Sequence, residues 1–170
     1  MAKLSSKMVD ELNAQMGREF NASNQYLSMA IYLDGRSLKE LSAFYYAQAE
    51  EERQHAMKFL QYLLNAGDVP VVPEMPKPVA EFESIERIAE MSLEYEQEVT
   101  RCIHELVDLA LSEKDHTTNR FLGWFVEEQL EEEATFNELI DVIKQSESLL
   151  ELEQYVFRQK PGSGITVGEE

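Results

Sequence analysis

Six side chains that can bind or support a metal ion recur at matching depth in the four longest periodic segments. They are Glu19, Glu52, His55, Glu96, Gln129 and Glu132. Each follows the alternating steps of four and three residues that keep side chains on one face of a bundled helix. An ionised carboxylate is costly to bury without a partner, and four acids in one layer also repel one another. No Lys or Arg lies on these faces, so the pattern predicts a bound cation.

The spacing of two of these residues indicates which cation. Glu52 and His55, at i and i+3 on one helix face, form the Glu-x-x-His element of di-iron carboxylate bundles. Mixed carboxylate and imidazole ligation suits iron or manganese better than calcium, which prefers oxygen ligands alone. A symmetric site needs a second such element, but the fourth segment has Gln129-x-x-Glu132. An amide is a weaker iron ligand than a carboxylate, so one metal is expected to be held more loosely.

Further carboxylates crowd the same depth. They are Glu51, Glu128, Glu131 and Glu133. A solvated helix face would explain this run of charges as readily as a metal site. Glu128 and Glu132 lie four residues apart on one face, however, and like charges at this spacing destabilise a helix unless a cation bridges them. The sharper hypothesis is a third metal position.

The elements that must position these residues are helices. The four long segments cover residues 6–35, 38–66, 84–113 and 117–145, and a short fifth covers 149–158. All four long segments are rich in Leu, Ala, Glu, Gln and Met, which favour helix. Ser148 followed by Glu151 predicts a capping box for the fifth helix. We expect a domain over residues 1–160 and a flexible tail over 161–170.

The connector Gly67–Phe82 carries four prolines, which exclude helix and favour an extended path. Its 16 residues can reach roughly 50 Å, whereas the preceding helix is roughly 43 Å long. The connector can therefore cross the whole bundle and leave the second and third helices parallel. A linker between two separate hairpins would expose their apolar stripes. The prediction is an all-α four-helix bundle with a long crossover between helices 2 and 3 and a short fifth C-terminal helix.

The net charge and the cysteine content exclude several classes of partner and of metal site. The formal net charge is −18, so nucleic acid and anionic membrane surfaces would be repelled, although acids that only keep a protein soluble would give the same charge. The single cysteine, Cys102, excludes an internal disulfide, a thiolate-bound zinc and an iron–sulfur cluster within one chain. The N-terminal residues hold no apolar run for a signal peptide or membrane span. We expect a cytoplasmic protein that binds cations.

From about Leu4 to Phe157 the sequence resembles a bacterial or archaeal non-haem ferritin. The most specific stretches are EERQHAM at 51–57, YEQEVT at 95–100 and FLGWFVEEQLEEE at 121–133. The resemblance implies that Glu19, Glu52 and His55 hold a first iron, and that Glu52 bridges to a second iron bound by Glu96. Gln129 would lie close by. A third iron would use Glu51, Glu128, Glu131 and Glu132.

The function implied by the resemblance is iron storage and detoxification. Fe(II) would be oxidised by dioxygen or hydrogen peroxide at a di-iron ferroxidase centre within the subunit. The Fe(III) mineral would be stored in a hollow 24-subunit cage of identical chains. The resemblance also gives Tyr26 a redox or hydrogen-bonding role, whereas the pattern alone favours a core tyrosine bonded to a carboxylate. For Trp124 packing is expected.

Related families and unrelated functions fit less well. Bacterioferritins bind haem through a methionine where this chain has Arg53, so haem is not expected. The four-cysteine domain of rubrerythrins is missing, and the basic tail common in small DNA-protecting relatives is replaced by an end in Glu169 and Glu170. Two rivals remain: a non-storing di-iron oxidoreductase acting on a small substrate, and a helical scaffold with an incidental acid cluster. No function is proposed for Cys102 or for either remaining histidine.

Overall fold

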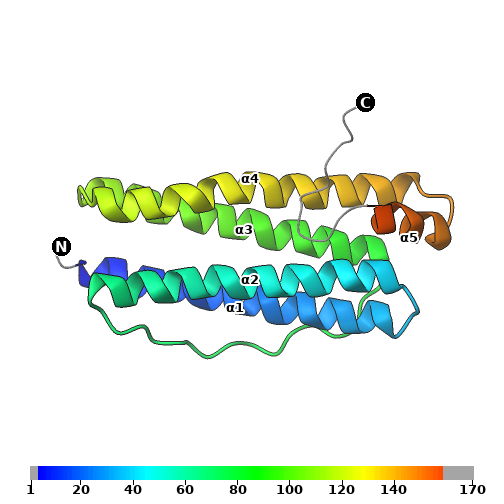
Figure 1. Ribbon diagram of the computed structural model, residues 1–170, viewed down its shortest axis with the longest axis horizontal. Helices are drawn as coiled ribbons and strands as arrows, with labels where there is room; N and C mark the ends of the chain where they lie inside the picture. The colour runs from blue at the N-terminus through cyan, green and yellow to red at the C-terminus, as the bar shows by residue number, and fades with distance from the viewer. Residues whose placement is uncertain (1–3, 159–170) are drawn as a thin grey trace.

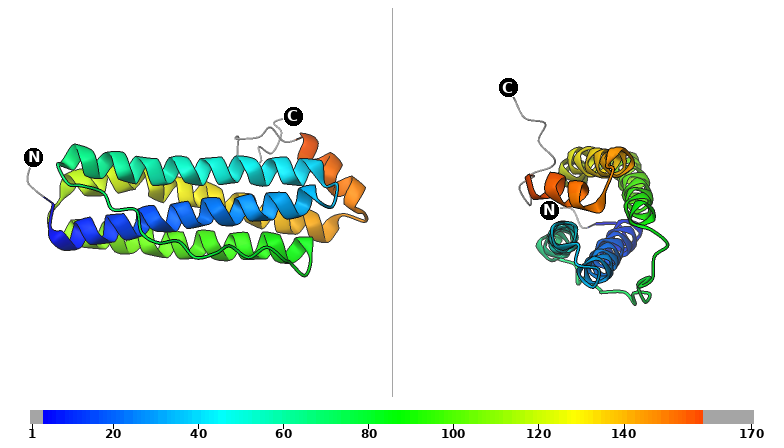
Figure 2. Two further views of the ribbon diagram at one scale, coloured as in Figure 1. Left: turned by 90° about the horizontal axis from the view of Figure 1, so that it is seen from below. Right: turned by 90° about the vertical axis from the view of Figure 1, so that its right-hand side faces the viewer.

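The computed structural model describes residues 4–158, which form five α-helices and no strand. Their bounds are α1 Ser6–Asp34, α2 Lys39–Ala66, α3 Ile85–Ser112, α4 His116–Gln145 and α5 Leu149–Arg158. The closest pairs, α1 with α2 and α3 with α4, are two antiparallel hairpins (Figure 1), and α5 lies across one end of the bundle (Figure 2). The predicted fold class is confirmed, with every helix bound within one residue of its expected place. The predicted tail at 161–170 lies outside the described residues.

The helix ends follow local side-chain chemistry. The residues that cap the first turns of α1, α3 and α4 are Ser5, Ser84 and Asp115. Their side-chain oxygens accept backbone N–H groups that a helix start leaves unpaired. At α5 the Ser148 hydroxyl accepts the N–H of Glu151, but the Glu151 carboxylate accepts the N–H of Glu147 rather than that of Ser148. The predicted capping box is therefore only half formed.

The connector runs along α1 from one end of the bundle to the other (Figure 1). Near its start, the Val71 N–H donates to Asn13 Oδ1 at 2.8 Å. Further on, the Gln25 amide bonds to both the N–H and the carbonyl of Val79, at 2.9 and 3.0 Å. At the end of the connector, the Tyr32 hydroxyl donates to the backbone carbonyl of Phe82. The crossover is confirmed, and α2 and α3 run parallel as expected.

Two apolar clusters fill the two halves of the bundle. One includes Tyr26, Leu33, Leu41, Tyr45, Phe136 and Leu139, and the other includes Met8, Leu12, Phe59, Leu63, Ile103 and Phe125. Most predicted core positions are buried, although Ser23, Tyr62, Ile85 and Ile143 are only partly so. The predicted metal-binding residues lie between the two clusters. Within residues 4–158 no helix is both long and apolar enough to cross a membrane.

Gly17 marks the closest approach of the connector to α1. A Cβ atom at this position would lie 2.3 Å from Cγ of Pro73, well inside van der Waals contact. Glycine costs about 1 kcal/mol relative to alanine inside a helix. Gly17 is tolerated within α1 despite this cost, because the ring of Pro73 occupies the space that a side chain would need.

We expect Gly17→Ala to lower the thermal midpoint of unfolding, because overpacking costs about 1 to 3 kcal/mol and outweighs the gain in helix propensity. Gly123→Ala is the matched control, since nothing lies within 4 Å of the Cβ that it would add in α4. Scanning calorimetry should place the control at or above the parent protein. Equal midpoints for the two variants would contradict the seating of Pro73 on α1.

Candidate metal centre

The layer between the two apolar clusters receives polar side chains from all four long helices. They are Glu19 from α1, Glu52 and His55 from α2, Glu96 from α3, and Gln129 and Glu132 from α4. Each is at most 5% exposed, so water cannot compensate the charge of the acids. The structure brings together on one level the residues that the sequence pattern predicted.

An inner cluster consists of Glu19, Glu52 and His55, whose ligand atoms all lie within 4.8 Å of one another. Glu19 Oε2, both Glu52 carboxylate oxygens and His55 Nδ1 have no hydrogen-bond partner. Buried polar atoms are nearly always paired, so four such atoms without a partner in one place indicate a binding site. Two ligand atoms on opposite sides of an ion at ~2.1 Å lie about 4.2 Å apart, so small side-chain shifts would close this group around a metal ion.

Glu96 is already hydrogen-bonded from two sides. The Tyr26 hydroxyl donates to one carboxylate oxygen, and Gln129 Nε2 donates to the other at 3.1 Å and to the Glu96 backbone carbonyl at 3.2 Å. Tyr26 therefore has the carboxylate partner that the sequence pattern favoured. Because an N–H donor cannot bind a cation, Gln129 would have to use its Oε1 atom as an iron ligand.

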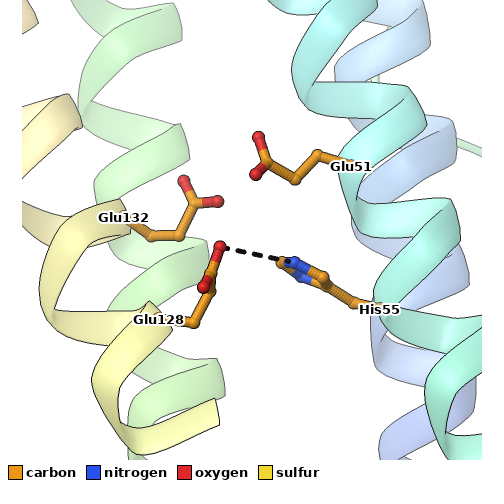
Figure 3. A group of neighbouring side chains, drawn as sticks. All are labelled: Glu51, His55, Glu128 and Glu132. Atoms are coloured by element: carbon orange, nitrogen blue, oxygen red, sulfur yellow. Dashed lines mark ion pairs between the residues drawn. The ribbon is translucent and has the colours of Figure 1, made fainter. Parts of the chain in front are cut away.

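An outer cluster lies between α2 and α4. Figure 3 shows Glu51 and His55 on one side facing Glu128 and Glu132 on the other, and one ligand atom from each lies within 4.8 Å of the rest. Glu51 and Glu128 are partly exposed, so this cluster is closer to solvent than the inner one. Glu131, predicted for the third iron, is exposed and is not in this group, since it points about 100° around the helix from its neighbour Glu132.

His55 belongs to both clusters. Its Nδ1 lies 3.5 Å from Glu52 Oε2, and its Nε2 lies 3.9 Å from Glu128 Oε1. The rings of Trp124 and Phe125 stand edge-on to the imidazole, at 5.4 and 5.9 Å between centroids. These contacts fix the ring with one nitrogen toward each cluster.

Burial sets the protonation of the layer. It raises the pKa of Glu52 and of Glu132 well above the usual range, and the charge of Glu96 adds to the shift in both. It raises the pKa of Glu96 to about 7 although hydrogen bonds from Tyr26 and Gln129 oppose the change. Burial also lowers the pKa of His55 to about 3, so the imidazole is neutral and its lone pair can bind a metal.

Two residues around the site were missed by the sequence pattern. Lys58 lies off the predicted face with its Nζ 3.3 Å from the centroid of the Trp124 ring, and its charge acts on carboxylates of both clusters. Gln15 is fully buried and donates to Glu19. Their spacings, three residues after His55 and four before Glu19, were the available signal, because side chains at such distances meet on one helix.

Comparison with known proteins agrees with this geometry. The model of the ferritin-like domain family matches residues 9–146. A bacterial non-heme ferritin of Staphylococcus saprophyticus is 41% identical over 140 residues, which cover 82% of this chain and 84% of the relative. The chain belongs to the ferritin family. The resemblance noted in the sequence is thereby confirmed.

Other ferritins extend the match. A bacterial non-heme ferritin of Campylobacter jejuni is 40% identical over 141 residues, which cover 83% of this chain and 84% of that one. A crystal structure of an open-pore ferritin from the hyperthermophilic archaeon Archaeoglobus fulgidus has a TM-score of 0.90 and 36% identity. The superposition covers 94% of this chain and 100% of the archaeal one, so the bundle, crossover and short last helix all belong to the ferritin fold.

The raised pKa values predict how the stability of the metal-free protein depends on pH. An acid whose pKa is raised by folding stabilises the protein below its ordinary pKa, and this contribution is lost as pH rises through the folded value. The lowered pKa of His55 acts in the opposite direction, but only below 6.5, its ordinary value. With a chelator present, the thermal midpoint should therefore fall from pH 6.5 to pH 8. For Glu96 alone the loss is on the order of 1 kcal/mol.

Glu96→Gln should make this fall less steep, as measured by scanning calorimetry in chelator. Glu94→Gln is the control, because the exposed Glu94 pairs with Arg87, which lowers its pKa and keeps it ionised over the whole range. If both variants kept the slope of the parent protein, Glu96 would not titrate in this range.

Proposed function

We propose that the chain is a subunit of an iron-storage ferritin that oxidises Fe(II) with dioxygen and keeps the Fe(III) as mineral inside a cage. The observation that carries this proposal is the inner cluster of buried carboxylate and imidazole atoms without partners, inside a bundle of the ferritin family. Iron is the substrate and the stored product. Each Fe(II) gives up one electron, and dioxygen accepts it.

The residues of the inner cluster have separate roles in this proposal. Glu19, Glu52 and His55 hold a first Fe(II), and Glu52 bridges to a second that Glu96 also binds. Carboxylate anions stabilise Fe(III) more than Fe(II), which makes loss of the electron easier. The apolar clusters on either side keep water from the layer and strengthen these interactions. Gln129 keeps Glu96 in place and is the weaker contact of the second metal.

The outer cluster is the third iron site of the proposal. Glu51, Glu128 and Glu132 supply anionic oxygens, and His55 connects this site to the inner one. The partial exposure of Glu51 and Glu128 supports a place where iron is exchanged with solvent. The role of Glu131 stays a prediction. This exposed acid lies beside the site and would contact iron only transiently, as the iron enters or leaves.

The proposal extends to the assembly and the compartment. We propose a cage of 24 identical chains, in which the charge of −18 on each chain draws Fe(II) toward the shell. The unpaired thiol of Cys102 suits the reducing cytoplasm. Hydrogen peroxide is an alternative oxidant, and Tyr26, which donates to Glu96, is placed to exchange an electron or a proton with the site.

Aerobic loading with Fe(II), followed by size-exclusion chromatography with mass and iron determination, tests the proposal. We expect a large assembly that carries many Fe(III) ions per chain. An active monomer or dimer without mineral would instead favour a di-iron oxidoreductase that acts on a small substrate. A protein that neither binds Fe(II) stoichiometrically nor accelerates oxygen uptake would be a helical scaffold.

Glu52→Ala removes the proposed bridge and should slow rapid Fe(II) oxidation by roughly 100-fold or more in stopped-flow absorbance, since ligand loss costs more than loss of an outer partner. Assembly should persist, because Glu52 makes no hydrogen bond that holds the fold. Glu50→Ala is the control: it removes the same charge two residues earlier, from an exposed side chain paired with Arg53. An unchanged rate for Glu52→Ala would rule out the bridging role.

A further inference from the structure

A buried amide side chain donates a hydrogen bond to one carboxylate of the inner cluster. Gln15 lies on α1 one turn before Glu19 and is 0% exposed. Its Nε2 donates to Glu19 Oε1 at 2.8 Å, and its Oε1 accepts from Arg18 Nη1 at 2.9 Å. The amide can take only this orientation, because the reverse would place oxygen against carboxylate and nitrogen against guanidinium.

The bond from the Gln15 amide makes the two carboxylate oxygens of Glu19 unequal. Oε1 is occupied by the bond from Gln15, whereas Oε2 has no partner. A glutamate side chain has several rotatable bonds, and fixing them when a ligand binds costs conformational entropy. With Oε1 already held, part of that ordering is present before a metal ion arrives.

Arg18 anchors the amide from the solvent side. It is partly buried and lines a groove of about 260 Å³ that Lys7, Glu11, Cys102 and Glu105 also line. Its position lets the guanidinium remain hydrated while one N–H reaches Gln15. The chain of contacts therefore runs from the surface to a buried carboxylate through a single amide.

We propose that Gln15 is a positioning residue for the first iron, which holds Glu19 with Oε2 free for the metal while Arg18 holds the amide. The inference rests on the proposed function, in which Glu19 binds iron. The bond from Gln15 to Oε1 favours binding of the metal ion through Oε2, which has no hydrogen-bond partner.

Gln25 provides a matched control on the same helix. It is 2% exposed, and both ends of its amide are hydrogen-bonded, but to the backbone of Val79 in the connector. Methionine keeps the length and volume of glutamine without its hydrogen bonds. Gln15→Met and Gln25→Met therefore lose the same chemistry, and only the first touches a proposed iron ligand.

The test is titration of the assembled protein with Co(II), which reports binding without Fe(II) oxidation, by calorimetry and visible absorption. We expect both variants to have a lower thermal midpoint. Only Gln15→Met should bind the first Co(II) about 10-fold more weakly, as outer partners of metal ligands typically do when removed, and change its absorption band. Arg18→Met should weaken binding of the first Co(II) less than Gln15→Met does. Arg18→Lys keeps a charged donor and should bind Co(II) as the parent protein does.

Equal Co(II) affinity and spectrum for Gln15→Met and Gln25→Met would overturn the positioning role. If Gln15→Met does not assemble, the comparison of Arg18→Met with Arg18→Lys decides in its place, and equal binding by those two variants would overturn the role. Failure of the parent protein to bind Co(II) at all would instead contradict the proposed metal centre itself.

Discussion

Carboxylates that water would normally solvate lie in a layer from which water is excluded. Four of them come from four different helices, and the charges of the other three raise the pKa of Glu52 beyond what burial does. Without a bound cation, burial favours the protonated form of these acids, and their pKa values are raised even though the charge of Lys58 reaches the site. The rest of the bundle must be stable enough to hold this arrangement.

The two helical hairpins share the layer between them. The α1–α2 hairpin carries Glu19, Glu52 and His55, and the α3–α4 hairpin carries Glu96, Gln129 and Glu132. Neither hairpin contains the full set, so the layer exists only where they pack together. The apolar cluster on each side supplies the favourable burial that offsets the unfavourable desolvation of the acids. The long connector allows this packing because it lets α2 and α3 run in the same direction.

The helices and the depth of the layer could be predicted because periodicity encodes which face of a helix is buried. The hydrogen-bond partners could not, because spacing fixes the face but not the rotamer. Gln129 was expected as a weak ligand and is found donating to Glu96. The outer cluster includes His55, which was expected only for the first iron. It does not include Glu131, because neighbouring positions on a helix point in different directions.

The missed neighbours have the same physical origin. Lys58 reaches the site from outside the predicted face, because a long side chain can carry its charge several ångströms from its backbone. Gln15 was passed over because an isolated amide carries no charge to mark it. Both lie within one turn of a residue that was predicted, so chemistry around a site is best sought one turn to either side of it.

The connector changes what α1 can tolerate. Between Glu11 and Tyr26 every side chain of this helix is at least partly buried, since the core, the neighbouring helices and the connector pack against it. Most helices at a protein surface keep one face on which mutations accumulate freely. This stretch of α1 has no fully exposed position, so we expect the sequence of α1 to diverge more slowly between related chains than the sequence of any other helix in the bundle.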